Sequence, residues 1–191
     1  MKLTAILFLL ATTVFGQTQK LTVEPNHSTI GFSVTIAGGM TVVTGKFITY
    51  DLKLDLVDND LTKSNVQFVI RAESVTTDLK DRDDHLRAED FFYVEKYPEI
   101  VFTSTKIFAQ EKDKVTVEGD LTIRGVTKHV LLPFEITAYS PEKGLVALKL
   151  RSKLNRKEFG VGNNFKHTLI ENFLADDINL EINLWTKKDK R

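Results

Sequence analysis

Apolar side chains alternate with polar or small ones along most of this chain. The stretch from Thr29 to Ile36 shows the pattern clearly, because every second residue in it is apolar. Such alternation predicts a half-buried β-strand, since successive side chains of a strand point to opposite faces of the sheet. The same pattern recurs in the ranges 66–70, 115–123, 130–136, 146–150 and 178–184.

Turn-forming residues separate these segments. They lie at 38–39, 58–60, 111–114, 124–125 and 140–144. In the longer range 43–56 the apolar phase changes between Phe47 and Tyr50, which predicts a bulge or bend. Strands at this spacing, with no helix between them and no internal repeat, predict an all-β sandwich or an up-and-down barrel.

One segment, residues 77–98, departs from the alternation. It is dense in charge, and Leu79, Leu86 and Phe91 recur at intervals nearer to a helical turn. Asp83 and Asp84 favour a helix start, where carboxylates meet unpaired amides, and Pro98 ends whatever precedes it. We therefore expect one or two short helices across an end of a barrel.

The N-terminus resembles a secretory signal. Lys2 precedes an apolar run over residues 3–15, and Gly16 offers a small residue for cleavage. We expect export to the periplasm or the medium and removal of residues 1–16, which leaves residues 17–191 as a single domain. The run is shorter than the roughly 20 residues of a bilayer span, so no stable membrane anchor is expected, a retained anchor being the alternative.

The overall composition narrows the function classes. The chain has 26 basic and 26 acidic residues, a balance without the electrostatic footprint of a nucleic-acid-binding protein. It contains no cysteine, which excludes disulfides and thiol catalysis. The four histidines are isolated from one another, and no nucleophile elbow or phosphate-binding loop occurs, so neither a metal site nor catalytic residues are predicted.

Four blocks of sequence resemble the YceI-like family, a set of mostly exported bacterial proteins. The blocks lie, in the family's order, at 27–34, at 82–87 with 90–92 and 96–98, at 117–128, and at 155–156 with 159–162. The resemblance implies an antiparallel, extended lipocalin-like barrel of about eight strands, with one or two short helices at a barrel end. It also implies that the barrel holds a polyisoprenoid chain such as a ubiquinone or a polyprenyl pyrophosphate.

The resemblance thus implies non-catalytic binding or transport of a long-chain isoprenoid or similar lipid in the barrel interior, with no cofactor besides that ligand. From the phase of the alternation, the side chains expected to line the interior are Ile30, Phe32, Val34, Phe47, Phe68, Phe102, Leu121, Leu132, Phe134 and Phe159. The pattern alone equally fits an ordinary packed core in a structural or stress-associated module. Whether the chain forms a homodimer is left open.

A charged cluster has three interpretations. Its members, with one histidine from an earlier block, are His27, Arg82, Asp83, His85, Arg87 and Asp90. They could cap the short helices predicted at the barrel end and pair with one another there. They could contact a polar head group at the barrel mouth, since guanidinium suits a phosphate or a quinone carbonyl. In the third interpretation, His85 and Asp83 serve a hydrolase or lyase acting on a small lipid. We expect Arg156 and Phe159 to pack under the barrel end.

Overall fold

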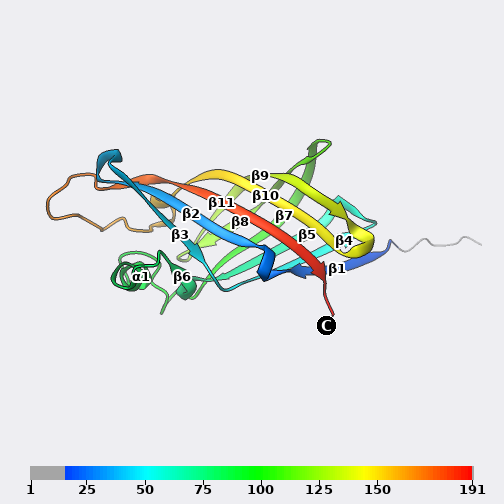
Figure 1. Cartoon of the computed structure of the whole chain (residues 1–191), viewed down its shortest axis with the longest axis horizontal. Coiled ribbons are helices and arrows are strands. Elements are labelled where there is room, and N and C mark those ends of the chain that lie inside the picture. The colour runs from blue at the N-terminus through cyan, green and yellow to red at the C-terminus, as the bar shows by residue number, and fades with distance from the viewer. Residues whose placement is uncertain (1–15, 191) are drawn as a thin grey trace, which may run out of the picture.

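The computed structural model describes residues 16–190, so the predicted signal peptide lies outside the described residues except for Gly16. Strands dominate the fold (Figure 1). They are β1 (Thr18–Val23), β2 (Thr29–Ile36), β3 (Thr41–Phe47), β4 (Tyr50–Val57), β5 (Asp60–Arg71), β6 (Val75–Thr76), β7 (Glu99–Glu111), β8 (Lys114–Ile123), β9 (Val126–Ser140), β10 (Leu145–Asn155) and β11 (Leu174–Lys188). The α-helix is α1 (Lys80–Arg87), and 3-10 turns include η1 (Pro25–His27) and η2 (Ala37–Gly39).

These strand segments close into an antiparallel barrel with eight strand positions around its axis, and each position, whether one strand or two consecutive segments, is called a stave here. The sheet runs from β1 through β4, β5, β7, β8, β9 and β10 to β11, which pairs back to β1. Three staves are interrupted: β2 continues β1, β3 continues β4, and β6 continues β5, each pair meeting the same neighbours. The predicted break in the range 43–56 is the gap between β3 and β4. The up-and-down barrel predicted from the sequence is therefore confirmed.

Two of the tight hairpin turns use residues with positive φ. Asp58 and Asn59 have φ near 53° and 55° between β4 and β5, and Arg124 and Gly125 have φ of 50° and 75° between β8 and β9. Two successive positive φ angles match the right-handed twist of the flanking strands. The structure therefore has tight turns at both positions where the sequence predicts them.

One helix, not two, crosses a barrel end. The helix α1 begins at Lys80, and its first turn contains Asp83, as we expected from the sequence, whereas Asp84 lies beyond that turn. Residues 88–98 continue in turns that return the chain to β7. The acidic residues of the first turn are Asp81 and Asp83, and the N-terminal end of a helix favours such negative charge. Within residues 16–190, no helix is long and apolar enough to cross a bilayer.

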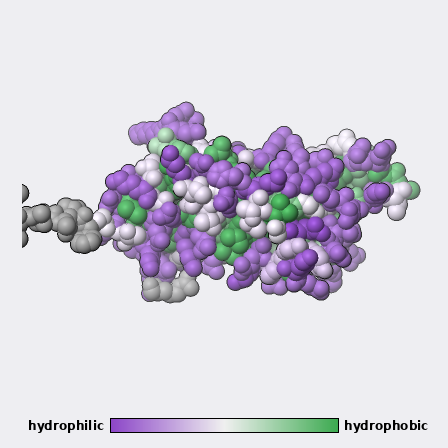
Figure 2. Space-filling view, turned by 180° about the vertical axis from the view of Figure 1, so that it is seen from behind, coloured by the Kyte–Doolittle hydropathy of each residue, from purple (hydrophilic) through white to green (hydrophobic). Residues whose placement is uncertain are grey.

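The inward side of the barrel wall is apolar. The outer surface is mostly hydrophilic, as Figure 2 shows for one face. Along β4, for example, Leu52, Leu54 and Leu56 are buried, and Asp51, Lys53 and Asp55 between them are exposed. Burial of the inward set supplies the main driving force for closing the sheet, because apolar area removed from water is stabilising by about 25 cal/mol per Å². One wall thus separates water from a hydrocarbon-like interior.

Candidate functional site

The centre of the barrel contains an apolar cavity of about 140 Å³. Side chains from every stave surround it, among them Phe68, Phe102 and Phe134, and Thr186 is its one polar side chain. The Thr186 hydroxyl has its own partners, because it donates to the Gly144 carbonyl at 3.0 Å and accepts from the Val146 amide at 2.8 Å. The cavity therefore offers no free polar group to a ligand.

A second cavity, of about 120 Å³, continues the first toward α1. The two share six lining residues, namely Phe32, Phe47, Ile100, Ile123, Leu154 and Leu180. The rings of Phe32 and Phe47 lie 5.9 Å apart, and Phe47 meets Phe92 edge-on at 5.6 Å. Together the cavities form an elongated apolar space that is narrowed by aromatic rings where they join.

The two ends of this space differ. At the end away from α1, Leu21, Leu56 and Val146 are almost completely buried and border neither cavity, so that end is packed shut. At the α1 end, Leu86 and Phe92 cover the second cavity from the segment 80–98. We call α1 and residues 88–98 the lid. An elongated ligand would enter at the lid.

All ten side chains that the sequence predicts as lining border at least one of the two cavities. Eight surround the central cavity, and Val34 and Phe159 surround only the second. Their contact with a ligand remains a prediction. The alternation also marks lining residues that the prediction omitted, such as Val66, Leu148 and Ile182, since each has the inward phase of its strand. Leu86 and Phe92 have no such signal, because their position depends on how the lid folds back.

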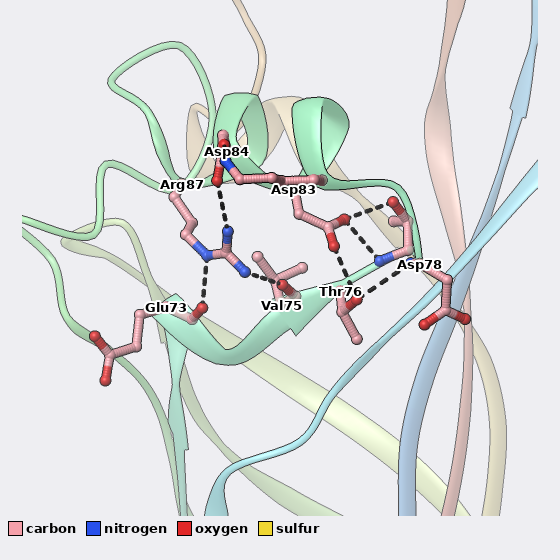
Figure 3. A network of polar contacts seen from close by, with 9 residues as sticks. Glu73, Val75, Thr76, Asp78, Asp83, Asp84 and Arg87 are labelled. Carbon is pink, nitrogen blue, oxygen red and sulfur yellow. Dashed lines mark hydrogen bonds and ion pairs between the residues drawn. The ribbon is translucent and has the colours of Figure 1, made fainter.

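The lid is fastened to β6 by a network of hydrogen bonds (Figure 3). The buried Asp83 carboxylate accepts from the Thr76 hydroxyl at 2.8 Å, and from the Thr77 amide and hydroxyl at 2.7 and 2.6 Å. Burial raises the pKa of Asp83, but the hydrogen bonds from Thr77 and Thr76 outweigh it and hold that pKa below its ordinary value. Asp83 is therefore a fixed anion that anchors α1.

Arg87 fastens the other end of α1. Its guanidinium donates to the carbonyl of Glu73 at 2.7 Å and to the carbonyl of Val75 at 2.8 Å, and it pairs with Asp84 at 3.1 Å (Figure 3). Arg82 donates to the Thr77 hydroxyl at 2.7 Å and to its carbonyl at 3.1 Å. Both arginines thus bind the lid to the segment 73–77 that precedes it, which agrees with the first interpretation of the charged cluster.

His85 and Asp90 lie on the outer side of the lid. Nε2 of His85 is 3.4 Å from a carboxylate oxygen of Asp90, and the imidazole ring meets Phe91 and Phe165 edge-on at 5.0 and 5.7 Å. Neither residue borders a cavity, and the same holds for Arg82, Asp83 and Arg87. Contact of this cluster with a ligand head group stays a prediction, and it would require the lid to move.

His27 does not join the cluster. It lies in η1, on the outer surface where β1 passes into β2, and its ring is 4.9 Å from that of Trp185. Figure 1 shows this turn about halfway along the barrel, whereas α1 covers one end. Its place between two strand segments of one stave, which the sequence does not reveal, separates it from the lid.

Arg156 is the charged side chain that borders the second cavity, and the list of predicted head-group residues omitted it. Its guanidinium is buried and donates to the carbonyls of Val161, Gly162, Leu174 and Ala175 at 2.8–3.2 Å. Burial lowers its pKa, and Asp176, 3.2 Å away, raises it. As expected from the sequence, Arg156 packs under the barrel end, where it holds the segment that leads into β11.

Among residues 16–190 no group of three or more histidine, aspartate or glutamate side chains could hold a metal ion. The Asp83 oxygens accept hydrogen bonds from Thr76 and Thr77, and the imidazole of His85 lies beside Asp90. What the arrangement offers chemically is an apolar enclosure behind a fastened lid.

Comparison with known proteins agrees with this architecture. Residues 21–185 match the YceI-like domain. A UPF0312 protein of Photorhabdus laumondii is 35% identical over 130 residues, which are 68% of this chain and 67% of that protein. Across other curated relatives the matched part is 57–75% of their length.

Two solved structures share the barrel. The YceI protein of Campylobacter jejuni is 28% identical, with a TM-score of 0.67 over 79% of this chain and 88% of that one. A polyisoprenoid binding domain from Saccharophagus degradans is 15% identical, with a TM-score of 0.72 over 88% and 98% of the two chains. The second likeness concerns the fold alone. From the match over nearly all of the described barrel, this chain belongs to the YceI-like domain family.

Proposed function

We propose that this protein binds a long-chain isoprenoid or similar amphiphilic lipid, of the quinone or polyprenyl phosphate type, inside the barrel and without changing it chemically. The observation that carries the proposal is the elongated apolar space, which runs from the packed end to the lid with no unpartnered polar group along it. Each methylene moved there from water contributes about 0.8 kcal/mol, so a long tail is favoured over a short one. The fold shared with a polyisoprenoid binding domain supports this ligand class.

The size of the space says how such a ligand is accommodated. The cavities of about 140 and 120 Å³ are each smaller than the roughly 300–1,000 Å³ of pockets for drug-sized ligands. A long tail must therefore occupy both and displace the rings of Phe32 and Phe47 where they join. Its polar head would remain at the lid, near Arg156 and the charged cluster.

Binding of a lipid without catalysis is better supported than an enzymatic role for the charged residues. A hydrolase or lyase that used His85 and Asp83 would need both groups at the reacting atoms, within hydrogen-bond reach of a substrate. Asp83 is instead buried in its contacts with Thr76 and Thr77, and neither residue borders a cavity. The signal-like residues 1–16 support a place of action in the periplasm or outside the cell.

The test is to purify the protein, identify what it holds by native mass spectrometry and solvent extraction, and compare two tryptophan variants on one strand. Val66 borders the central cavity, whereas Val69, three residues on in β5, has the outward phase. We expect Val66→Trp to lose most of the co-purified lipid and Val69→Trp to keep it. A wild-type barrel that holds no lipid, and takes up none from a mixture of polyprenols and quinones, would refute the proposal.

A further inference from the structure

Four exposed large apolar side chains, including the two most exposed among the described residues, lie at the lid end of the barrel. Met40 follows η2 and is 84% exposed, Leu79 precedes α1 and is 52% exposed, and Leu169 and Ile170 in the segment 160–173 are 88% and 37% exposed. Figure 1 shows these three segments projecting at the same end, and Figure 2 shows hydrophobic surface at the tip of that end. We call Met40, Leu79, Leu169 and Ile170 the apolar crown.

The segments that carry the crown are connected to one another. The Ala37 amide donates to the Phe173 carbonyl at 2.7 Å, which joins the β2–β3 hairpin to the segment 160–173. The ring of Phe165 lies 5.4 Å from that of Phe91, which joins the same segment to the lid. The crown therefore consists of three separate tips that are connected to one another at the lid end of the barrel.

The position of Leu169 and Ile170 is set by His167. The imidazole of His167 stacks on Phe173 with 4.1 Å between ring centroids and planes 8° apart. Its Nδ1 accepts hydrogen bonds from the amides of Leu169 and Ile170, both at 3.2 Å. This arrangement holds two large apolar side chains outward in water, where the fold itself gains nothing from them.

We propose that the apolar crown docks the protein on the surface of a phospholipid bilayer, with the lid facing the membrane. This inference rests on the proposed function, since a lipid in the barrel must be taken from or delivered to a bilayer. The far end of the barrel is packed shut, so exchange of a lipid takes place at the lid, and the crown lies at the same end.

The shape and charge of the crown suit a bilayer. Side chains on separate tips enter the boundary between head groups and acyl chains one by one, whereas a protein partner requires a continuous complementary surface of about 800 Å². Lys80 and Lys166 are exposed directly beside Leu79 and near Leu169, so their ammonium groups would lie at the level of the lipid phosphates while their stems follow the apolar side chains. Four exposed carboxylates, Asp78, Asp81, Asp84 and Glu171, outnumber these two lysines, and Asp84 pairs with Lys80, so docking relies on the apolar side chains and not on anionic lipid.

The experiment is flotation of the purified protein with phosphatidylcholine vesicles. The test variant is L169D/I170D, and the matched control is Leu131→Asp, which changes an equally apolar, 61% exposed side chain on the β9 wall away from the lid. We expect the wild type and Leu131→Asp to float with the vesicles, and L169D/I170D to bind at least tenfold less. Retained binding by L169D/I170D, an equal loss by Leu131→Asp, or no flotation of the wild type would overturn the proposal. So would light scattering that shows a dimer which L169D/I170D abolishes.

Native mass spectrometry of the same samples separates this inference from the proposed function. L169D/I170D should keep the lipid that it acquires during expression, because neither residue borders the central or the second cavity of the barrel. If the protein holds a lipid but does not float with vesicles, docking alone is refuted. If the protein floats with vesicles in a way that L169D/I170D abolishes, but never holds a lipid in the barrel, the carrier function alone is refuted.

Discussion

The Thr76 hydroxyl donates a hydrogen bond of 2.8 Å to the buried carboxylate of Asp83, and this contact joins the last strand segment before the lid to the helix of the lid. Thr77 adds two further hydrogen bonds to the same side chain. Because these bonds arise within seven residues, the attachment of α1 is local, whereas residues 89 and 90 of the lid are held by Arg124 and Gly162, which donate to the carbonyls of Glu89 and Asp90 at 2.7 and 2.9 Å. The attachment of α1 is therefore separable by mutation from the stability of the barrel.

Replacing this anion tests that separation. Asp83→Asn turns one acceptor oxygen into a donor facing Thr76 or Thr77, and we expect a loss of about 1–3 kcal/mol confined to the lid at pH 7. Because the pKa of Asp83 is lowered on folding, its contribution is present above about pH 3.9 and is lost as the pH falls through the folded value. Hydrogen exchange of residues 80–87 measures the effect. The exposed Asp81→Asn is the control, and equal exchange in both variants would contradict the assignment.

A second prediction concerns Arg156. Its planar guanidinium satisfies four backbone carbonyls and Asp176 in a buried position, which the compact ammonium of lysine cannot reproduce. We expect Arg156→Lys to lower the free energy of unfolding by about 3 kcal/mol. Urea unfolding measures it, and the exposed neighbour Lys157→Arg should change stability little. A loss of less than about 1 kcal/mol for Arg156→Lys would show that the carbonyls find other donors.

The third prediction concerns the narrow region between the cavities. Phe32 lies against Gly45 of β3, and a Cβ atom at Gly45 would stand 2.3 Å from Cζ of the ring. We expect Gly45→Ala to cost about 1–3 kcal/mol, since the ring must leave its position. Adding Phe32→Leu should recover much of that cost, because leucine leaves the space that the new methyl needs. Thermal unfolding of the two single variants and the double variant measures the coupling, and additive effects would contradict it.

The fourth prediction concerns pH. On the outer wall, His129 lies between Asp120 and Glu118, at 2.8 and 2.7 Å, and hydrogen bonds to Asp120 and then Glu118 raise its pKa. A pKa raised on folding gives stability that is complete below the unfolded value of about 6.5 and is lost as the pH rises through the folded value. The wild type should therefore exceed His129→Gln in stability by more at pH 6 than at pH 9.

Urea unfolding at the two pH values measures this difference. In a background of Glu118→Gln and Asp120→Asn, the effect of His129→Gln should no longer depend on pH over this range. An effect of His129→Gln that is the same at pH 6 and pH 9 in the native background would show that the carboxylates do not favour the charged imidazole.

The sequence by itself determined the barrel wall. A strand repeats every two residues, so the phase of apolar residues such as Phe68 and Phe134 fixes which side chains point inward whatever their distant neighbours are. For this reason most of the strands, the turn at Arg124 and Gly125, the break after Phe47 and most of the cavity-facing side chains followed from the local pattern, whereas β1, β6 and β7 lay outside the predicted ranges.

Only the tertiary structure decided what the irregular segments do. The partners of Asp83 and Arg87, the place of His27 beside Trp185, and the carbonyl groups that Arg156 binds depend on how the chain turns back between strands, which no period encodes. The width of the interior was also undetermined by the sequence, because the volume left between inward rings depends on how closely opposite walls approach. Inward direction is a local property of a strand, whereas enclosure is a property of the closed barrel.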